Sequence, residues 1–153
     1  LLSSFYTYVA RPVKNVSNSM EPNYKNGSYL LVHPTSTFKR GDVAVYILPV
    51  KGTFVHYIKR VIGVPGDEVG IKNGVVFIES EGQSFQDPLS SFTSQTFPDG
   101  TWKLGENEYF VLGDNRTQSS DSRFWGTLPE DLIIGRALLR LWPVSEIDVM
   151  PGR

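Results

Sequence analysis

The sequence predicts a mostly-β fold, and three observations support this prediction. Short runs rich in β-branched and aromatic residues recur along the chain, as is typical of strands. Turn-forming pairs separate several of these runs, and Asn73-Gly74 in particular favours a two-residue hairpin turn. Only one short segment carries a helical pattern. With 153 residues, of which 40% are hydrophobic, the chain can bury one core, so we expect a single domain over residues 1–153.

The expected strands are bounded by turn signals in chain order. The Asn26-Gly27 pair follows a polar loop and precedes the first expected strand. The runs expected to form strands are residues 28–33, 43–48, 54–64, 69–72, 75–78, 108–112 and 136–142. The one expected helix covers residues 129–134, because its proline suits a first helical turn and two acidic residues follow it.

Residues 79–107 differ in composition from the rest of the chain. They are rich in serine and threonine and contain Phe85, Phe92 and Phe97. Three phenylalanines are too many for a solvated linker, because each would expose a large apolar surface to water. We therefore expect an irregular or hairpin-bearing insertion that packs its phenylalanines on the domain.

Composition excludes several kinds of site. The chain has no Cys, so it forms no disulfide, no thiolate zinc site and no cysteine nucleophile. Its 2 His are too few for a three-His metal centre. Lys and Arg total 15 against 16 Asp and Glu, a net charge of -1, so we expect no nucleic-acid partner. We expect no metal or cofactor, and the chemistry must come from Ser, Lys, Asp, Glu, Tyr or Arg.

The chain starts with an apolar, aromatic segment. Residues 1–10 contain leucine, phenylalanine and tyrosine but no charged residue. Aromatic residues of this kind are favoured at a membrane interface. Two interpretations stay open at this point: an ordinary first strand, or a segment that directly follows a transmembrane anchor.

One expected strand places a lysine among apolar neighbours. Side chains alternate along a strand, so Tyr57 and Lys59 share one face of residues 54–64 with two valines, while His56 and Ile58 share the other. Burial among apolar neighbours lowers the pKa of an amine, because it disfavours the charged form. A neutral amine can accept a proton from a hydroxyl. The alternative is a lysine that extends to solvent or pairs with a carboxylate.

Two loops carry unusually many polar side chains. Residues 113–126 follow an expected strand, and within them Asp121 and Arg123 are close enough to clamp a neighbouring loop through a charge-assisted pair. In residues 16–23, Ser19 stands beside a methionine and shortly before a proline. Each loop by itself fits a purely structural role.

Taken together, these segments match the motifs of a known family in their order. Ser-Met-Glu-Pro stands at residues 19–22 and Arg-Gly-Asp at residues 40–42. Lys-Arg-Val-Ile-Gly-Val-Pro-Gly-Asp occupies residues 59–67, and a Gly-Asp-Asn-Arg-x-x-Ser-x-Asp-Ser-Arg-x-x-Gly motif occupies residues 113–126. The chain resembles the bacterial type I signal peptidases, also called leader peptidases, which are membrane-bound serine proteases with a Ser–Lys dyad. The four motifs extend over nearly the whole chain.

This resemblance implies a role for each matched residue. Ser19 is expected to be the nucleophile, and Lys59, uncharged, its general base. Ser119 is expected to orient the lysine amine, and the Ser17 hydroxyl to hold the oxyanion together with the Ser19 backbone N–H. The residues expected to support the site are Asp121 and Arg123, and the candidates for lining shallow substrate pockets are Met20, Tyr24, Tyr57 and Ile58.

The resemblance also implies a fold, a substrate and a location. The fold is expected to be the β core shared by signal peptidases and repressor autoproteases, at about residues 11–71 and 108–143, with a variable insertion at about 72–107. The substrates are expected to be exported preproteins, cut after Ala-x-Ala-like sites, with the segment before the cut bound as an added strand. We expect a monomer in the cell membrane, anchored before residue 1, with its catalytic domain against lipid on the extracytoplasmic side.

Several residues and functions stand as alternatives. Asn23 replaces the usual threonine of the family, and Ser17 stands where many members have glycine. His56 is a rival base, because related archaeal and endoplasmic-reticulum enzymes use histidine, but the motif assigns Lys59. The alternative functions are a Ser–Lys autoprotease of the repressor type and a non-catalytic assembly factor. Ordinary structural roles are expected for His33 and, from turn chemistry after glycine, for Asp42, Asp67 and Asp114.

Overall fold

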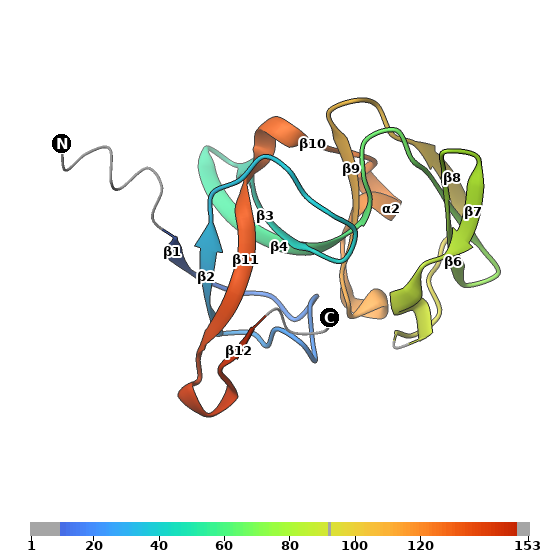
Figure 1. Ribbon diagram of the computed structural model, residues 1–153. Coiled ribbons are helices and arrows are strands. Elements are labelled where there is room, and N and C mark those ends of the chain that lie inside the picture. Colours follow the sequence, from blue (N-terminus) through green and yellow to red (C-terminus); the bar gives the residue numbers. More distant parts are fainter. Residues whose placement is uncertain (1–9, 92, 150–153) are drawn as a thin grey trace.

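Two antiparallel β-sheets make up the molecule (Figure 1). A computed structural model describes residues 10–91 and 93–149. The first sheet has the strand order β1-β2-β11-β3-β4-β9-β10, with β12 paired to β11, and the second has the order β7-β6-β5-β8. The prediction of a mostly-β fold is confirmed.

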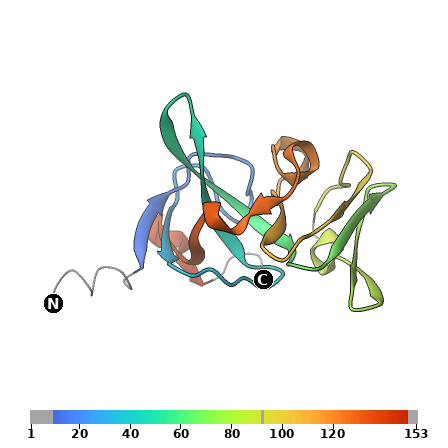
Figure 2. The same cartoon turned by 90° about the horizontal axis from the view of Figure 1, so that it is seen from above.

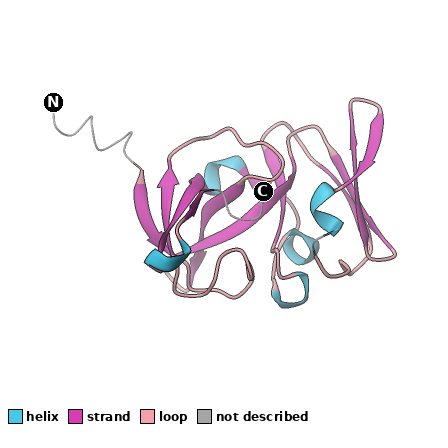
Figure 3. Cartoon of the chain, turned by 60° about the horizontal axis from the view of Figure 1, so that its bottom comes forward, coloured by secondary structure: helices cyan, strands magenta, loops and turns pink. Residues whose placement is uncertain are grey.

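Strands dominate both halves, and the helical segments are short (Figure 3). The strands of the first sheet are β1 (Arg11–Lys14), β2 (Tyr29–His33), β3 (Val43–Val50), β4 (Thr53–Gly63), β9 (Glu108–Leu112), β10 (Leu128–Pro129), β11 (Ile133–Trp142) and β12 (Asp148–Val149). Those of the second are β5 (Glu68–Lys72), β6 (Val75–Ser80), β7 (Gln83–Gln86) and β8 (Gly100–Lys103). The helical segments are α2 (Ser122–Trp125) and the 3₁₀ turns Pro88–Ser91, Arg116–Gln118, Glu130–Leu132 and Val144–Glu146. Each run expected to be a strand forms one, with small shifts at its ends.

Strand β3 is buried on both faces, because its alternate side chains enter two different core clusters. Val43 and Val45 pack on one face with Met20 and other apolar residues of the β1–β2 side. Ala44 and Tyr46 pack on the other face with residues of β9 and β11. This double burial places β3 and its partner β4 at the centre of the first sheet.

Strand β9 connects the two sheets by the same alternation. Val111 belongs to the core of the first sheet, while Phe110 and Leu112 pack with Val69 and Ile78 of the second. In Figure 1, β9 accordingly lies on the side of the first sheet that faces the group formed by β6, β7 and β8. Figure 2 shows the β3–β4 hairpin extending away from this junction. The loop that follows β9 therefore starts where both cores meet.

The expected helix at residues 129–134 is wrong. Pro129 pairs with Glu108 in strand β10, and only residues 130–132 form a single 3₁₀ turn before β11 begins. Leu128 and Ile133 on either side of the turn are buried in the same core cluster. Burying both in the sheet outweighs the weak local helix signal of a proline followed by acidic residues.

The segment 79–107 is more regular than expected. It contains β7 and β8, which pair with β6 and β5, so the second sheet spans residues 68–103. Phe85 and Phe97 are 37% and 50% exposed, so they pack on the domain only in part. The Phe85 ring covers the Arg40 guanidinium, 5.3 Å from the ring centre, and Phe92 lies outside the described residues.

The apolar start predicted to lie near a membrane falls outside the described residues, apart from Ala10. Within residues 10–91 and 93–149, no helix has the length and apolar character that crossing a bilayer requires.

Candidate active site

Ser19 and Lys59 meet in the first sheet, although 40 residues separate them in the chain. The loop between β1 and β2 supplies Ser19, and the central strand β4 supplies Lys59. Lys59 Nζ donates to Ser19 Oγ at 2.7 Å and to the Ile58 carbonyl oxygen at 3.1 Å. The two residues are 3% and 2% exposed. The amine and the hydroxyl are therefore in direct contact and shielded from water.

Burial changes the protonation of Lys59. Desolvation lowers the pKa of its amine from 10.5 to about 8, against the opposing charges of Asp121 and Asp114. With this pKa, about a tenth of the amine is uncharged at pH 7. The uncharged amine can accept the proton of the Ser19 hydroxyl that it already contacts.

Ser17 completes the immediate surroundings of Ser19. Its hydroxyl donates to Ser19 Oγ at 3.0 Å and accepts the Ser19 backbone N–H at 3.1 Å. The two groups expected to hold an oxyanion are thus next to the Ser19 hydroxyl and bonded to each other. A carbonyl oxygen that enters the site would have to replace this mutual bond.

Ser119 does not bond to the lysine amine directly. Its hydroxyl donates to Asp121 Oδ2 at 2.7 Å. Among the described residues, the hydrogen-bond partners of Lys59 Nζ are the Ser19 hydroxyl and the Ile58 carbonyl oxygen. The expected role of Ser119 in orienting the amine therefore stays a prediction.

Gly113 lets the two loops of the site approach each other. A Cβ atom at this position would lie 2.2 Å from Ser119 Oγ and 2.5 Å from the Ser19 carbonyl oxygen. The neighbouring Asn115 N–H donates to that same carbonyl oxygen at 2.9 Å. Only glycine leaves enough room for this contact between the loops.

We expect Gly113→Ala to destabilise the fold by about 1–3 kcal/mol, as overpacking does in a well-packed core. It also displaces Ser19, so any activity that depends on the contact between Ser19 and Lys59 falls further than the loss of folded protein explains. Thermal unfolding and activity assays measure both effects. Gly70→Ala is the matched control, because an added Cβ there meets nothing within 4 Å. Equal behaviour of the two variants would refute the close contact.

Asp121 and Arg123 hold the loop after β9 in shape. The fully buried Asp121 caps α2, and its Oδ2 accepts the Gly113 N–H at 3.0 Å. Arg123 Nε donates to Asp121 Oδ1 at 2.8 Å, and its Nη1 donates to the Phe97 carbonyl oxygen at 2.7 Å. The pair thus clamps the segment before β8, the kind of contact expected of it.

A buried ion pair that the sequence analysis missed links the lysine strand to the same loop. Arg60 Nε and Nη2 donate to Asp114 Oδ1 and Oδ2 at 2.8 and 2.6 Å, with both side chains under 5% exposed. Asn23 Nδ2 donates to Asp114 Oδ2 at 2.8 Å. Asp114 is therefore more than a turn residue. An arginine at a buried strand position requires a carboxylate partner, and this was the available signal.

Asp42 and Asp67 keep the turn role expected of them, and each also forms an ion pair, Asp42 with Arg136 and Asp67 with Arg40. Asp42 Oδ2 accepts the Lys39 N–H, and Asp67 Oδ2 accepts the Val64 N–H, both at 2.9 Å. Asp67 also receives two hydrogen bonds from Arg40, at 2.9 and 2.6 Å. The Arg-Gly-Asp segment is thereby tied to the end of the lysine segment.

The four candidate pocket residues differ in exposure. Met20, Tyr24 and Ile58 are at most 3% exposed and pack together in one core cluster, to which the Ser19 loop contributes Met20 and Tyr24. Burial also raises the pKa of the Tyr24 hydroxyl. Tyr57 is half-buried and stacks on Tyr46, with ring centres 5.7 Å apart. Substrate contact by these residues stays a prediction.

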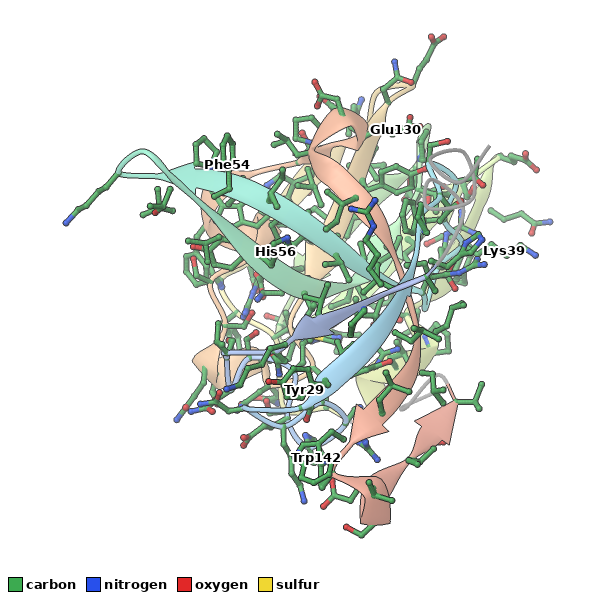
Figure 4. The ribbon with its side chains drawn as sticks, turned by 90° about the vertical axis from the view of Figure 1, so that its left-hand side faces the viewer. Tyr29, Lys39, Phe54, His56, Glu130 and Trp142 are labelled. Carbon is green, nitrogen blue, oxygen red and sulfur yellow. The ribbon has the colours of Figure 1, made fainter. Side chains whose placement is uncertain are left out.

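His56 lies away from the Ser–Lys contact. It is exposed and lines a groove of about 660 Å³ between β1, β2 and the β3–β4 hairpin. Figure 4 shows it on the same strand as Phe54. Within the part of the chain that the structure describes, no hydrogen bond joins His56 to Ser19, and no three His, Asp or Glu side chains are grouped to hold a metal ion.

Comparisons with known proteins identify the relatives of this chain. The family model described as "Signal peptidase, peptidase S26" matches residues 1–142. The chain is 33% identical over 152 residues to a probable signal peptidase I-2 of Synechocystis, covering 94% of this chain and 68% of that protein. It is 36% identical to signal peptidase I of Leptolyngbya laminosa, covering 88% of this chain and 61% of that protein.

A relative and a solved structure from other bacteria extend the likeness. The chain is 32% identical to signal peptidase IB of Staphylococcus aureus, covering 91% of this chain and 81% of that protein. A crystal structure of a signal peptidase I from Enterococcus faecalis is similar with a TM-score of 0.51 and 28% identity, covering 65% of this chain and 96% of that one. The chain belongs to the signal peptidase family, peptidase S26.

Proposed function

We propose that this chain is a serine endopeptidase that removes signal peptides from exported preproteins by cutting after Ala-x-Ala-like sites. The single observation that carries the proposal is the buried contact of 2.7 Å between Lys59 Nζ and Ser19 Oγ in a member of the signal peptidase family. A hydroxyl next to an amine with a lowered pKa is an activated nucleophile.

In the proposed reaction, Ser19 Oγ attacks the carbonyl carbon of the scissile peptide while uncharged Lys59 takes the hydroxyl proton. The Ser19 N–H and the Ser17 hydroxyl turn from each other to the oxyanion. The Lys59 ammonium then gives its proton to the leaving amine as the C–N bond breaks. Water, deprotonated by the same lysine, cleaves the resulting ester and returns the Ser19 hydroxyl.

An extended substrate can bind beside strand β4. Strand β9 pairs with β4 only from Arg60 onward, and among the described residues no strand pairs with that edge over residues 53–59. Phe54 and His56 of this part of β4 line the groove of about 660 Å³, which Pro12 and Val13 of β1 also line. A peptide added as a strand along residues 53–59 would run toward Lys59, the residue of β4 that contacts Ser19.

The membrane association of the proposed enzyme is supported by an exposed apolar surface. Tyr29 and Trp142, paired between β2 and β11, are 42% and 54% exposed and lie close together in Figure 4. The exposed apolar residues that follow Trp142 in the chain are Val144, Ile147 and Val149. We propose that this surface contacts lipid on the extracytoplasmic side of the cell membrane, with the enzyme acting as a monomer.

The rate of cleavage is expected to rise with pH. Only the uncharged Lys59 amine can serve as base. Because its pKa is about 8, most of the amine is protonated and inactive below pH 8. We expect kcat/KM to fall about tenfold per pH unit below pH 8 and to level off above it. A pH–rate profile on a peptide substrate measures this. A rate that is constant down to pH 5 would contradict an amine base.

Mass-spectrometric mapping of cleavage in a preprotein, added in detergent, tests the proposed function. We expect one cut, directly after an Ala-x-Ala-like site, that Ser19→Ala abolishes. An autoprotease of the repressor type would cut its own chain and leave the preprotein intact. A non-catalytic assembly factor would cut neither, and either result would refute the proposal.

A further inference from the structure

Asn15 directly follows β1 and begins the loop that carries Ser19. The residue is 3% exposed. Its Nδ2 donates to the carbonyl oxygen of Ser17 at 3.0 Å, and its Oδ1 accepts the Ser17 N–H at 3.2 Å. The same Nδ2 donates to the carbonyl oxygens of Tyr24 and Lys25 at 3.1 and 3.0 Å. One side-chain amide therefore binds the N–H and the carbonyl oxygen of Ser17, and also the segment of the loop that leads back to β2.

The backbone of Asn15 is fixed as well. Its N–H donates to the Ser28 carbonyl oxygen at 2.7 Å, and its carbonyl oxygen accepts the Gly27 N–H at 2.7 Å. These bonds connect the two ends of the loop. The backbone of Asn15, whose side-chain amide holds Ser17, is thus fixed to the far end of the loop.

The chemistry of this position requires an amide. An amide offers two N–H donors and a carbonyl acceptor, and here the donors face three carbonyl oxygens while the acceptor faces an N–H. A carboxylate of the same shape would put an oxygen against those carbonyl oxygens. An apolar side chain would remove this donor from the carbonyl oxygens of Ser17 and Tyr24 and the acceptor from the Ser17 N–H.

The consequence for the site lies in Ser17. Asn15 holds both the N–H and the carbonyl oxygen of Ser17, so the Ser17 hydroxyl can move mainly by rotation of its own side chain. This hydroxyl lies 3.0 Å from Ser19 Oγ. We propose that Asn15 is a positioning residue that holds Ser17 so that its hydroxyl can reach the oxyanion formed by attack of Ser19. This inference rests on the proposed function and adds a residue that contacts no substrate itself.

Steady-state cleavage of an Ala-x-Ala peptide by Asn15→Asp, Asn15→Ser and a matched control measures this role. We expect Asn15→Asp to lower kcat about 10- to 100-fold, less than the 10²–10³ typical for losing an oxyanion donor outright. Asn15→Ser keeps an acceptor for the Ser17 N–H, so its loss of kcat is smaller. Asn26→Asp, an exposed position at the far turn of the same loop, leaves kcat unchanged.

A double-mutant cycle with Ser17→Ala separates positioning from general damage to the loop. In the Ser17→Ala background, we expect Asn15→Asp to lower kcat by less than about threefold, since the positioned hydroxyl is already gone. Losses that multiply would overturn the role, as would unchanged kcat in Asn15→Asp alone. If Asn15→Asp does not fold, the Asn15→Ser cycle gives the same comparison. A wild-type chain that does not cut the peptide overturns the proposed function and this role together.

Discussion

Replacing Lys59 by Met is expected to abolish cleavage while the protein stays folded. The variant keeps the apolar stem but has no nitrogen to take the Ser19 proton, so kcat should fall about 10⁵- to 10⁶-fold, as for other residues of a nucleophile–base unit. Ser19→Ala is expected to give the same loss, and combining the two should add little, because they act in one step. Single-turnover assays on an Ala-x-Ala peptide measure these losses.

The same Lys59→Met variant has a predicted effect on stability. The pKa of Lys59 is lower in the folded protein than the usual 10.5, so below pH 8 the unfolded chain holds this proton more tightly. Folding therefore carries a cost below pH 8, up to about 3 kcal/mol, that disappears as the pH rises to 10.5. We expect Lys59→Met to unfold at higher temperature than wild type at pH 7, with the difference shrinking above pH 8.

Lys72→Met is the control for both effects, because Lys72 is exposed on β5 in the second sheet. It should cleave and unfold like wild type. Normal turnover by Lys59→Met would remove this lysine from the proposed mechanism.

Asp114→Ala is expected to cause the largest loss of stability. Arg60 is 1% exposed, and this change leaves its guanidinium without the carboxylate that receives two of its hydrogen bonds. Breaking a buried ion pair by removing one partner typically costs about 3–5 kcal/mol. Chemical denaturation measures the change in the free energy of unfolding.

A double variant and a surface control make this prediction specific. Arg60→Met combined with Asp114→Leu should recover much of the lost stability, because no unpaired charge stays buried. Glu68→Ala breaks an exposed pair with Lys103, whose nitrogen and oxygen are 3.5 Å apart, and should cost under about 1 kcal/mol. Equal losses for Asp114→Ala and Glu68→Ala would contradict the structural role of the buried pair.

Much of the fold was predictable because strand signals in this sequence are local. β-Branched runs bounded by Asn-Gly and Gly-Asp turns marked β2 to β6, β9 and most of β11. The segment 129–134 was predicted wrongly, because burial of Leu128 and Ile133 in a shared core is not visible in the local pattern. The pairing of β7 and β8 with β6 and β5 was missed for the same reason, since it depends on partners elsewhere in the chain.

The contact between Ser19 and Lys59 was predicted from ordered motifs rather than from geometry. Strand alternation correctly placed Lys59 and Ile58 on opposite faces of β4, because neighbouring side chains of a strand point to opposite faces. The supporting bonds of Asn15 and Asn23 were not predictable, because their partners are fixed only by the folded shape of the loops. The buried Arg60 signalled a carboxylate partner but did not identify Asp114 as that partner. A motif identifies which residues meet, but it does not identify the hydrogen bonds and ion pairs that hold those residues in place.

A direct titration of the Lys59 amine tests the central physical claim. NMR of lysine side chains labelled with ¹³C at Cε, with Lys59→Met identifying the signal, follows the amine as the pH changes. We expect its chemical shift to change around pH 8, well below the usual lysine pKa of 10.5. An amine that stays protonated until pH 10 or above would contradict the claim that burial keeps Lys59 ready to deprotonate Ser19.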